Sequence, residues 1–112
     1  MAGFSSIPSV SVIVPTYKEA ENLPILVPQI AAALGNRGWI WEVIVVDDNS
    51  PDTTPEVLDQ LSKRFPQVRS LIRTKDRGLS SAVLAGMELA HHDFIVVMDA
   101  DLSHPPEAIP AP

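Results

Sequence analysis

Four short runs of apolar residues, separated by longer stretches with helical spacing, organise this chain. The runs cover residues 10–14 (VSVIV), 43–46 (VIVV), 68–72 (VRSLI) and 94–98 (FIVVM). β-branched residues are frequent in them and turn-forming residues bound them, so each run is predicted to be a strand. The second and fourth runs show no alternation with polar residues, which predicts parallel strands that are buried on both faces.

The three stretches between these strands carry apolar residues at helical spacing. The first follows Asn22, a favoured N-cap residue, and Pro28 inside it predicts a kink or a delayed start. The second has Pro55 as its first helical residue and stops at Pro66. The third covers residues 79–90. The chain is therefore predicted to have the element order β-α-β-α-β-α-β.

This alternation predicts an α/β fold with an open parallel sheet and right-handed crossovers, truncated after its fourth strand. Residues 1–9 are expected to be a loose lead-in. Residues 105–112 contain four prolines and are excluded from a helix interior or a central strand. If the strand order is the common 3-2-1-4, the carboxyl ends of strands two, one and four lie side by side.

Composition narrows the class of protein without naming its function. The 112 residues are 46% hydrophobic, which predicts one folded domain or a part of one. The lack of cysteine excludes a disulfide scaffold, a thiol nucleophile and a Cys-type zinc site. The net charge of -6 argues against nucleic-acid binding but suits a metal site. With no apolar run of about 20 residues and no signal-peptide pattern, a cytoplasmic setting is expected.

Polar residues follow the predicted strands, at the ends where open α/β sheets place their ligand sites. These segments are Pro15-Thr16-Tyr17-Lys18-Glu19 after the first strand, Asp47-Asp48-Asn49-Ser50 after the second, and Asp99-Ala100-Asp101 after the fourth. With the order 3-2-1-4, Glu19, Asp48 and the last two aspartates are expected to converge in one crevice, with Arg77 at its flank. Like charges converge only with compensation, so a cation or a donor-rich ligand is expected there.

Asp99 and Asp101 are the candidate metal ligands. Two carboxylates spaced i, i+2 just past a strand end can reach one hard cation, and Mg²⁺ or Mn²⁺ held in this way keeps open positions for phosphate oxygens. A simple acidic turn is the alternative; the apolar strand before the pair and the acids at neighbouring strand ends favour the metal. His104, beside the pair, is a further candidate ligand or donor whose role stays open.

The other candidate residues each keep two interpretations. Asp47 and Asp48 belong to a good turn sequence that can cap the next helix, while a carboxylate there can also accept hydrogen bonds from a base or ribose. Tyr17 either stacks on a base or covers the sheet edge. Glu19 is either a site residue or an acid that interacts with the dipole of the helix after it.

Half of the eight basic residues lie within nine positions, at Arg69, Arg73, Lys75 and Arg77. Such a run is usually a solvated face. Here it precedes a helix that begins near Gly78, and the amide groups and dipole at a helix N-terminus favour anions. Arg77 is therefore expected to contact phosphate.

Four motifs, spread in order over nearly the whole chain, carry a resemblance. They are residues 15–23 (PTYKEAENL), 45–52 (VVDDNSPD), 78–82 (GLSSA) and 98–107 (MDADLSHPPE). Together they resemble the family 2 glycosyltransferases, and most closely the dolichol-phosphate (polyprenol-phosphate) mannosyltransferases. Thr16 and the Ser-His-Pro-Pro-Glu ending resemble the mannosyl branch more than its glucosyl or aminoarabinosyl relatives.

The resemblance implies a GT-A fold whose N-terminal half binds a nucleotide sugar. Residues 10–112 would be this donor-binding half, with GDP-mannose as the donor. Lys18 departs from the asparagine that is common at its position. The residues that match the family's nucleotide pocket, including its contacts to the base or ribose, are Pro15, Tyr17, Glu19, Val46 and Asp48.

The same resemblance implies metal chemistry at the last motif. The residues that match Asp99 and Asp101 hold Mg²⁺ or Mn²⁺ against the diphosphate, and Ala100 approaches the nucleotide through its backbone. The implied reaction is inverting transfer of mannose to a polyprenyl phosphate, in which the leaving diphosphate must be neutralised. Asp101 is the candidate catalytic residue. With a second pKa of about 6, the acceptor phosphate is already an anion at pH 7 and needs no strong base.

Family members continue well past the last motif, in a part that carries the acceptor site and often membrane-associating helices. The 112-residue chain is therefore expected to bind nucleotide weakly and to be inactive alone. Peripheral association with the cytoplasmic face of a membrane would come through that further part. The unpaired edge of the predicted sheet also suggests homo-oligomers.

Other functions stay open. The chain could be a non-catalytic nucleotide- or metal-binding remnant, or could use another donor of the UDP-glucose type. A receiver-type signalling domain has a similar length and gathers acids around Mg²⁺, but its acid pair follows the first strand. A dinucleotide-dependent oxidoreductase should show G-x-G-x-x-G after the first strand, where this chain has Pro-Thr-Tyr-Lys-Glu.

Overall fold

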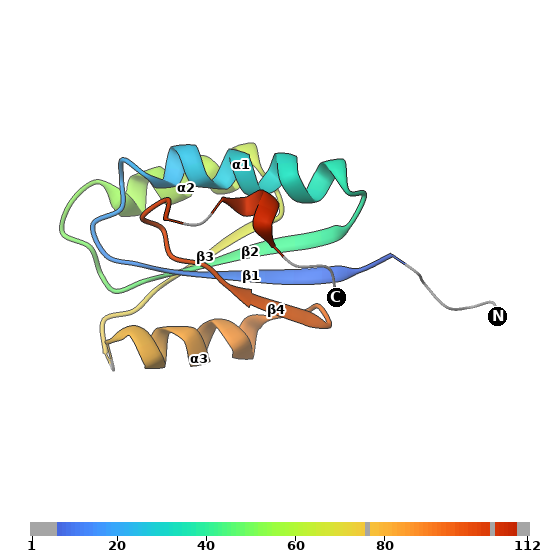
Figure 1. The fold of residues 1–112 in the computed structure, drawn as a ribbon. Coiled ribbons are helices and arrows are strands. Elements are labelled where there is room, and N and C mark those ends of the chain that lie inside the picture. The colour runs from blue at the N-terminus through green and yellow to red at the C-terminus, as the bar shows by residue number, and fades with distance from the viewer. Residues whose placement is uncertain (1–6, 76, 104, 110–112) are drawn as a thin grey trace.

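A four-stranded sheet forms the centre of the molecule, with α1 and α2 on one face and α3 on the other (Figure 1). The computed structural model describes residues 7–75, 77–103 and 105–109. Most of the predicted lead-in therefore lies outside the described residues, and β1 begins at Ser9. The elements are β1 (Ser9–Thr16), α1 (Leu23–Asn36), β2 (Ile40–Asp47), α2 (Thr54–Arg64), β3 (Val68–Ile72), α3 (Leu79–Leu89), β4 (Phe94–Val97) and the 3₁₀ turn η1 (Pro106–Ala108).

The strand order is β3-β2-β1-β4 and every strand pair is parallel. This confirms the predicted fold class, element order and strand order. In the register of the sheet, Thr16 lies opposite Asp47 and Ile13 lies opposite Val97. The carboxyl ends of β2, β1 and β4 therefore meet at one edge of the sheet, the carboxyl edge.

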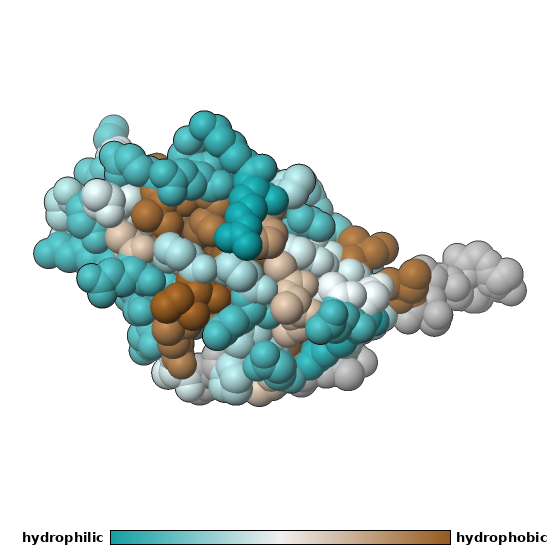
Figure 2. All heavy atoms as spheres, turned by 90° about the horizontal axis from the view of Figure 1, so that it is seen from above, coloured by the Kyte–Doolittle hydropathy of each residue, from teal (hydrophilic) through white to brown (hydrophobic). Residues whose placement is uncertain are grey.

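The two central strands supply the core because their side chains alternate between the two helical layers. Val12 and Val14 of β1 pack in the cluster beneath α1 and α2, while Ile13 packs beneath α3. α3 lies close to the sheet at Gly86, where an added Cβ atom would lie 2.6 Å from Cγ2 of Ile13. On the opposite side, hydrophilic side chains cover most of the surface of the α1–α2 layer, with apolar patches between them (Figure 2).

The prediction that the fourth run is buried on both faces is wrong. β4 is an edge strand, and Phe94, Ile95 and Val97 are 44%, 39% and 47% exposed. α3 packs on β1 and β2 instead. The composition of an apolar run does not reveal which neighbours will cover it, so β2 and β4 look alike in sequence although only β2 is central.

The first helix differs from its prediction in two ways. It begins at Leu23 without delay and continues through Pro28, whose missing N–H falls in the second turn. Leu26 and Ile30 are fully buried, so packing against the sheet stabilises this part of the helix. Asn22 does occupy the N-cap position, but its side chain makes no capping hydrogen bond. Its Nδ2 instead donates to Oε2 of Glu19 at 2.9 Å.

Candidate functional site

Four of the predicted site residues, Pro15, Tyr17, Asp48 and Arg77, come together at the carboxyl edge. A cavity of about 390 Å³ is lined by Tyr17, Asp48, Arg77 and Gly78. We call it the main cavity. A neighbouring pocket of about 180 Å³ shares Tyr17 and Asp48 and extends to Pro15. Loops that follow β1 and β2 and the loop that precedes α3 therefore form one concave surface.

The ring of Tyr17 lies beside two cationic groups. The ring is 45% exposed. Nζ of Lys18 lies 5.3 Å and Cζ of Arg77 lies 5.8 Å from its centroid, both within the range of cation–π attraction. An exposed aromatic face flanked by two positive charges suits a ligand that combines a flat ring with anionic groups.

Asp48 is held by an ion pair, in which one oxygen accepts two hydrogen bonds, and by a backbone amide. Nη2 and Nε of Arg73 donate to its Oδ1 at 2.7 and 3.1 Å. The N–H of Gly78 donates to its Oδ2 at 2.8 Å. A carboxylate offers about four acceptor positions. The described residues fill three of them, two on Oδ1 and one on Oδ2, so the second position of Oδ2 is the candidate acceptor for a ligand.

Asp47 has a different role, although it is the neighbour of Asp48. Its side chain is fully buried and accepts hydrogen bonds from Oγ1 of Thr16 at 2.7 Å and from the N–H of Ser50 at 2.9 Å. Oγ of Ser50 donates to it as well and accepts from the N–H of Lys18. Through these hydrogen bonds, Asp47 and Ser50 connect the loop after β2 to the loop after β1. Neither aspartate caps α2, since Asp52 accepts from the N–H of Thr54.

Left-handed backbone conformations occur in the loops that follow β1, β2 and β4 at this edge. Lys18, Asn49 and Leu102 have φ values of 59°, 57° and 64°. Asparagine tolerates this region, whereas lysine and leucine are disfavoured there by about 1 kcal/mol. Each of these residues directly follows a candidate site residue. The sharp local turns therefore set the directions in which the candidate side chains leave the sheet.

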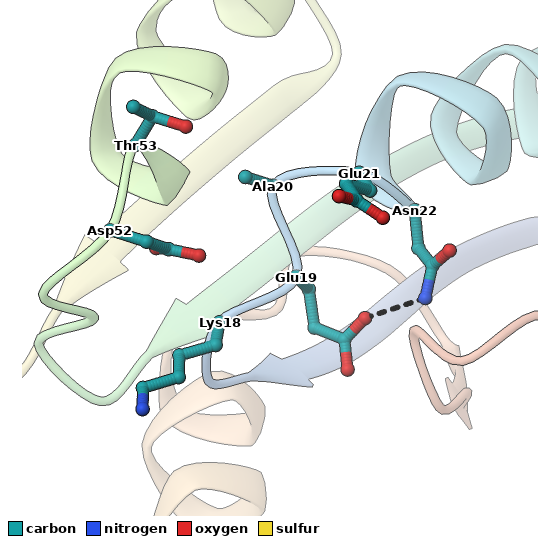
Figure 3. A pocket seen from close by; sticks show the side chains of 7 residues that line it. All are labelled: Lys18, Glu19, Ala20, Glu21, Asn22, Asp52 and Thr53. Atoms are coloured by element: carbon teal, nitrogen blue, oxygen red, sulfur yellow. Dashed lines mark hydrogen bonds between the residues drawn. The ribbon is translucent and has the colours of Figure 1, made fainter.

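Glu19 lies outside the main cavity. It lines a separate pocket of about 450 Å³, together with Lys18, Asp52 and Thr53 (Figure 3). Hydrogen bonds donated by the N–H and Oγ1 of Thr54 lower the pKa of Asp52, so that carboxylate is ionised at neutral pH. The predicted crevice is thus divided into neighbouring cavities, one with Asp48 and one with Glu19.

Asp99 and Asp101 are exposed on either side of Ala100, whose side chain is buried in the core beneath α1. Their carboxylate oxygens and their exposure fit a hard cation that keeps other oxygen ligands. Neither aspartate lines the three cavities described above. Within residues 7–75, 77–103 and 105–109, no three Asp, Glu or His side chains are placed to share a metal ion. His104 lies outside the described residues, so its role stays a prediction.

The segment after Asp101 is anchored to α1. The guanidinium of Arg37 donates from Nη1 to the carbonyl of Ile109 and from Nη2 to the carbonyl of Glu107, both at 2.7 Å. Ile109 is buried in the same core cluster as Ala100. The acid pair is therefore held between β4 on one side and this anchored turn on the other.

Val46 is placed differently from the other predicted contacts. Its side chain is fully buried in the cluster beneath α3, next to Ile13 and Ala82. Contact with a ligand would have to come from its main chain.

The basic segment is not one solvated face, because two of its members are paired with carboxylates. Arg69 forms an ion pair with Glu42 at 2.9 Å, and Arg73 forms one with Asp48 at 2.7 Å. Only Arg77 lines the main cavity. Arg73 was not predicted as a site residue, although a basic residue just past one strand and an acid just past a neighbouring strand indicate such a pair.

These features define a class of fold. An all-parallel sheet in the order 3-2-1-4, with its polar loops gathered at the carboxyl edge, is the GT-A arrangement. Residues 11–111 match the sequence model of the family described as glycosyl transferase family 2. The chain therefore belongs to glycosyl transferase family 2. This membership decides against the receiver domain and the oxidoreductase.

Curated relatives place the chain within the family. It is 54% identical over 101 residues to a dolichol-phosphate mannosyltransferase of Pyrococcus furiosus, covering 90% of this chain and 28% of that protein. A protein of the same name from Mycosarcoma maydis is 44% identical over 111 residues, covering 96% of this chain and 38% of that protein. The chain thus spans between 28% and 38% of the length of these relatives.

Solved structures agree with the fold. A mannosyltransferase from Pyrobaculum calidifontis, in complex with GDP-Man and Mn²⁺, has a TM-score of 0.76 and is 32% identical, covering 85% of this chain and 28% of that one. A mannosyl-3-phosphoglycerate synthase from Rubrobacter xylanophilus has a TM-score of 0.71 at 22% identity, covering 84% of this chain and 31% of that one, and supports the fold alone. Among the helices that the structure describes, none is long and apolar enough to span a membrane.

Proposed function

We propose that this chain is the donor-binding part of a mannosyltransferase that transfers mannose from GDP-mannose to a polyprenyl phosphate, with inversion and with Mg²⁺ or Mn²⁺. The observation that carries the proposal is the main cavity. It joins an aromatic ring, a carboxylate and a guanidinium at the carboxyl edge of a GT-A sheet. The likeness to dolichol-phosphate mannosyltransferases and to a mannosyltransferase bound to GDP-Man supports the choice of donor.

The nucleoside would occupy the main cavity. Tyr17 offers an exposed ring for stacking, and Pro15 extends the apolar wall beside it. Asp48 offers its one remaining acceptor position to an N–H or O–H group of the base or ribose. Arg77, next to the ring, would contact the phosphates as a charged donor.

The diphosphate would lie toward Asp99 and Asp101. These two aspartates would hold Mg²⁺ or Mn²⁺, which supplies charge neutralisation for the leaving diphosphate when bound. Ala100, fixed between them by its buried side chain, keeps the two carboxylates directed to the solvent side. Asp101 is also restrained locally, since its Oδ1 accepts from the N–H of Ser103 at 3.0 Å.

Binding of the acceptor phosphate needs basic side chains, and this chain offers few of them. Arg73 is paired with Asp48, so it is not available to an acceptor phosphate. We therefore expect the 112-residue chain to bind the donor nucleotide without normal turnover. A normal rate of mannosyl transfer by the isolated chain would contradict this part of the proposal. Work on a polyprenyl phosphate also implies association with a membrane surface, which we propose to be peripheral and on the cytoplasmic side.

Calorimetry with GDP, UDP and NAD, each with and without Mn²⁺, tests the proposal on the folded chain. We expect binding of GDP that depends on Mn²⁺ and is lost in Asp99→Asn and Asp101→Asn. Asp93→Asn, an exposed aspartate just before β4, is the matched control and should bind like the unmodified chain. Binding of GDP that needs no metal and survives both substitutions would contradict the assigned metal site. Tighter binding of UDP would favour a donor of the UDP-glucose type.

A further inference from the structure

We infer that Arg73 is a positioning residue for donor binding, because it holds Asp48 and the Gly78 loop together as one wall of the main cavity. This inference rests on the proposed function, since it concerns how the same cavity is shaped for its nucleotide. Arg73 does not line the main cavity itself, so it would act through Asp48, Gly78 and Arg77, which do.

The Arg73 side chain connects three separate parts of the carboxyl edge. It donates to Oδ1 of Asp48 from Nη2 and Nε, at 2.7 and 3.1 Å. Nη1 donates to Oγ of Ser81 and Nη2 donates to the carbonyl of Gly78, both at 3.1 Å. One guanidinium therefore links the end of β2, the loop before α3 and the first turn of α3.

This link closes a loop whose ends are fixed on both sides. The N–H of Arg73 donates to the carbonyl of Asp47 at 2.8 Å and extends the pairing of β3 with β2 by one residue. At the other end, the N–H of Gly78 donates to Oδ2 of Asp48. Gly78 has a φ of 133°, a conformation that needs glycine. Arg77 sits just before Gly78, so the closed loop places its guanidinium beside Tyr17.

Burial strengthens the link. The side chains of Arg73 and Asp48 are only 10% and 16% exposed, so water competes weakly for their hydrogen bonds. The planar guanidinium of arginine matches three acceptors in fixed directions, whereas the single ammonium group of lysine does not. Replacement by lysine would keep the charge near Asp48 but release Ser81 or Gly78.

The consequence for binding is specific to the nucleoside. Arg73 leaves one acceptor position of Asp48 directed at a ligand and keeps Arg77 near the ring of Tyr17. Loss of Arg73 would let the Asp48 carboxylate turn and the loop open. Recognition of the nucleoside should then weaken, whereas contacts of Asp99 and Asp101 with a metal and a diphosphate should stay.

Arg73→Lys tests the inference, with Arg69→Lys as the matched control. Arg69 also pairs with a carboxylate on β2, that of Glu42, but lines none of the cavities described above. Two readouts are needed: hydrogen exchange of the Gly78 amide by NMR, and calorimetric affinities for GDP and for inorganic pyrophosphate, both with Mn²⁺. For Arg73→Lys we expect exchange of the Gly78 amide at least about tenfold faster, because Asp48, whose Oδ2 accepts from this amide, is then held less firmly and the hydrogen bond opens more often.

In the same variant the affinity for GDP should fall about tenfold, which is the effect of losing one well-placed charged hydrogen bond. The affinity for pyrophosphate should fall less, by about two- to threefold, because the contact of Arg77 weakens while Asp99, Asp101 and the metal still hold the diphosphate. Arg69→Lys should leave all three quantities unchanged. Unchanged exchange of the Gly78 amide, or equal losses for GDP and pyrophosphate, would overturn the inference, because a merely structural residue would affect both ligands alike.

A second variant covers the case in which Arg73→Lys does not fold. Ser81→Ala removes one hydrogen bond of Arg73 together with the longer one that Oγ of Ser81 donates to the carbonyl of Gly78 at 3.3 Å, and we expect changes in the same direction of about two- to threefold. No change in Gly78 exchange or in GDP affinity would then overturn the inference. If the unmodified chain binds no GDP, the proposed function fails. Gly78 exchange still decides by itself whether Arg73 holds this loop.

Discussion

Two arginine–carboxylate pairs stand at opposite ends of α3, and they differ in what they leave open. Near the C-terminal end of α3, Arg69 pairs with Glu42 and also donates to the carbonyl of Leu89. Near its N-terminal end, Arg73 pairs with Asp48 and also donates to the carbonyl of Gly78. Both pairs therefore connect β3 or its end to β2 and to one end of the same helix.

The Arg69–Glu42 pair lies toward the amino edge of the sheet, where the strands begin, and the protein itself encloses it. Glu42 is 6% exposed. Besides the bond from Arg69, its Oε2 accepts from Oγ of Ser11 at 2.6 Å and from the N–H of His91 at 2.7 Å. Asp48, in contrast, keeps one acceptor position and lines the main cavity. The same type of ion pair thus stabilises the packing at Glu42, where the protein supplies the hydrogen bonds, and is suited to ligand binding at Asp48, where one acceptor position remains.

Among the tests of this comparison, Glu42→Gln is expected to have the largest effect. The amide removes the charge that Arg69 faces and offers N–H groups where only donors point inward, so we expect the free energy of unfolding to fall by about 2 to 4 kcal/mol. Urea unfolding measures the loss, and Glu56→Gln on the exposed face of α2 is the control. A loss no larger than that of the control would show that Glu42 does not stabilise the amino edge.

Asp48→Asn makes the equivalent change in the pair at the carboxyl edge. Its carboxamide still accepts from Arg73, so unfolding should become easier by only about 1 to 2 kcal/mol. Binding of GDP with Mn²⁺ should fall about tenfold or more, because the remaining acceptor position is replaced or turned. Urea unfolding and calorimetry give the two numbers. A larger stability loss than that of Glu42→Gln, with GDP binding intact, would reverse the assignment of the two pairs.

The pH dependence of the free energy of unfolding tests the role of Glu42 at the amino edge. Burial raises the pKa of Glu42, but hydrogen bonds from Ser11, His91 and Arg69 outweigh it and lower the pKa below the ordinary value of 4.5. The stabilisation from Glu42 is therefore complete above about pH 4.5 and is lost as the pH falls through the lower pKa of the folded state. Between pH 6 and pH 3, the free energy of unfolding should therefore fall less in Glu42→Gln than in the unmodified chain. The same pH dependence of the free energy of unfolding in both chains would contradict this role of Glu42.

The smallest expected effect concerns the carboxyl edge alone. Lys18 has a left-handed backbone conformation that asparagine tolerates better. Lys18→Asn should therefore stabilise the chain by about 0.5 kcal/mol, measured by urea unfolding. Lys63→Asn, on the last turn of α2, is a control that should not stabilise. Destabilisation by Lys18→Asn would mean that the contact of the Lys18 ammonium with Tyr17 outweighs the backbone strain.

The uncovered β4 edge yields one further test, of association between copies. Phe94, Ile95 and Val97 leave an apolar, unpaired edge. If this edge drives self-association, size-exclusion chromatography of the folded chain should show a dimer or larger species, and Val97→Lys should shift it to the monomer. A clean monomer at high concentration would reject the expectation.

The sequence by itself determined the order of elements, the parallel sheet and the family. Apolar runs of strand length alternate with helical stripes, and this local pattern leaves few arrangements open. The motif after each strand also located the site at the carboxyl edge, because parallel strands end at one edge. Tyr17, Asp48 and Arg77 were found in this way and share one cavity.

Only the tertiary structure decided which of two similar residues is open to a ligand. Asp47 and Asp48 are adjacent and chemically identical, yet Asp47 is sealed by Thr16, 31 positions away, and Asp48 is paired with Arg73, 25 positions away. The exposure of β4 was likewise decided by the helix that covers its neighbours. Hydrogen bonds and packing between distant segments set these outcomes, and no local pattern records them.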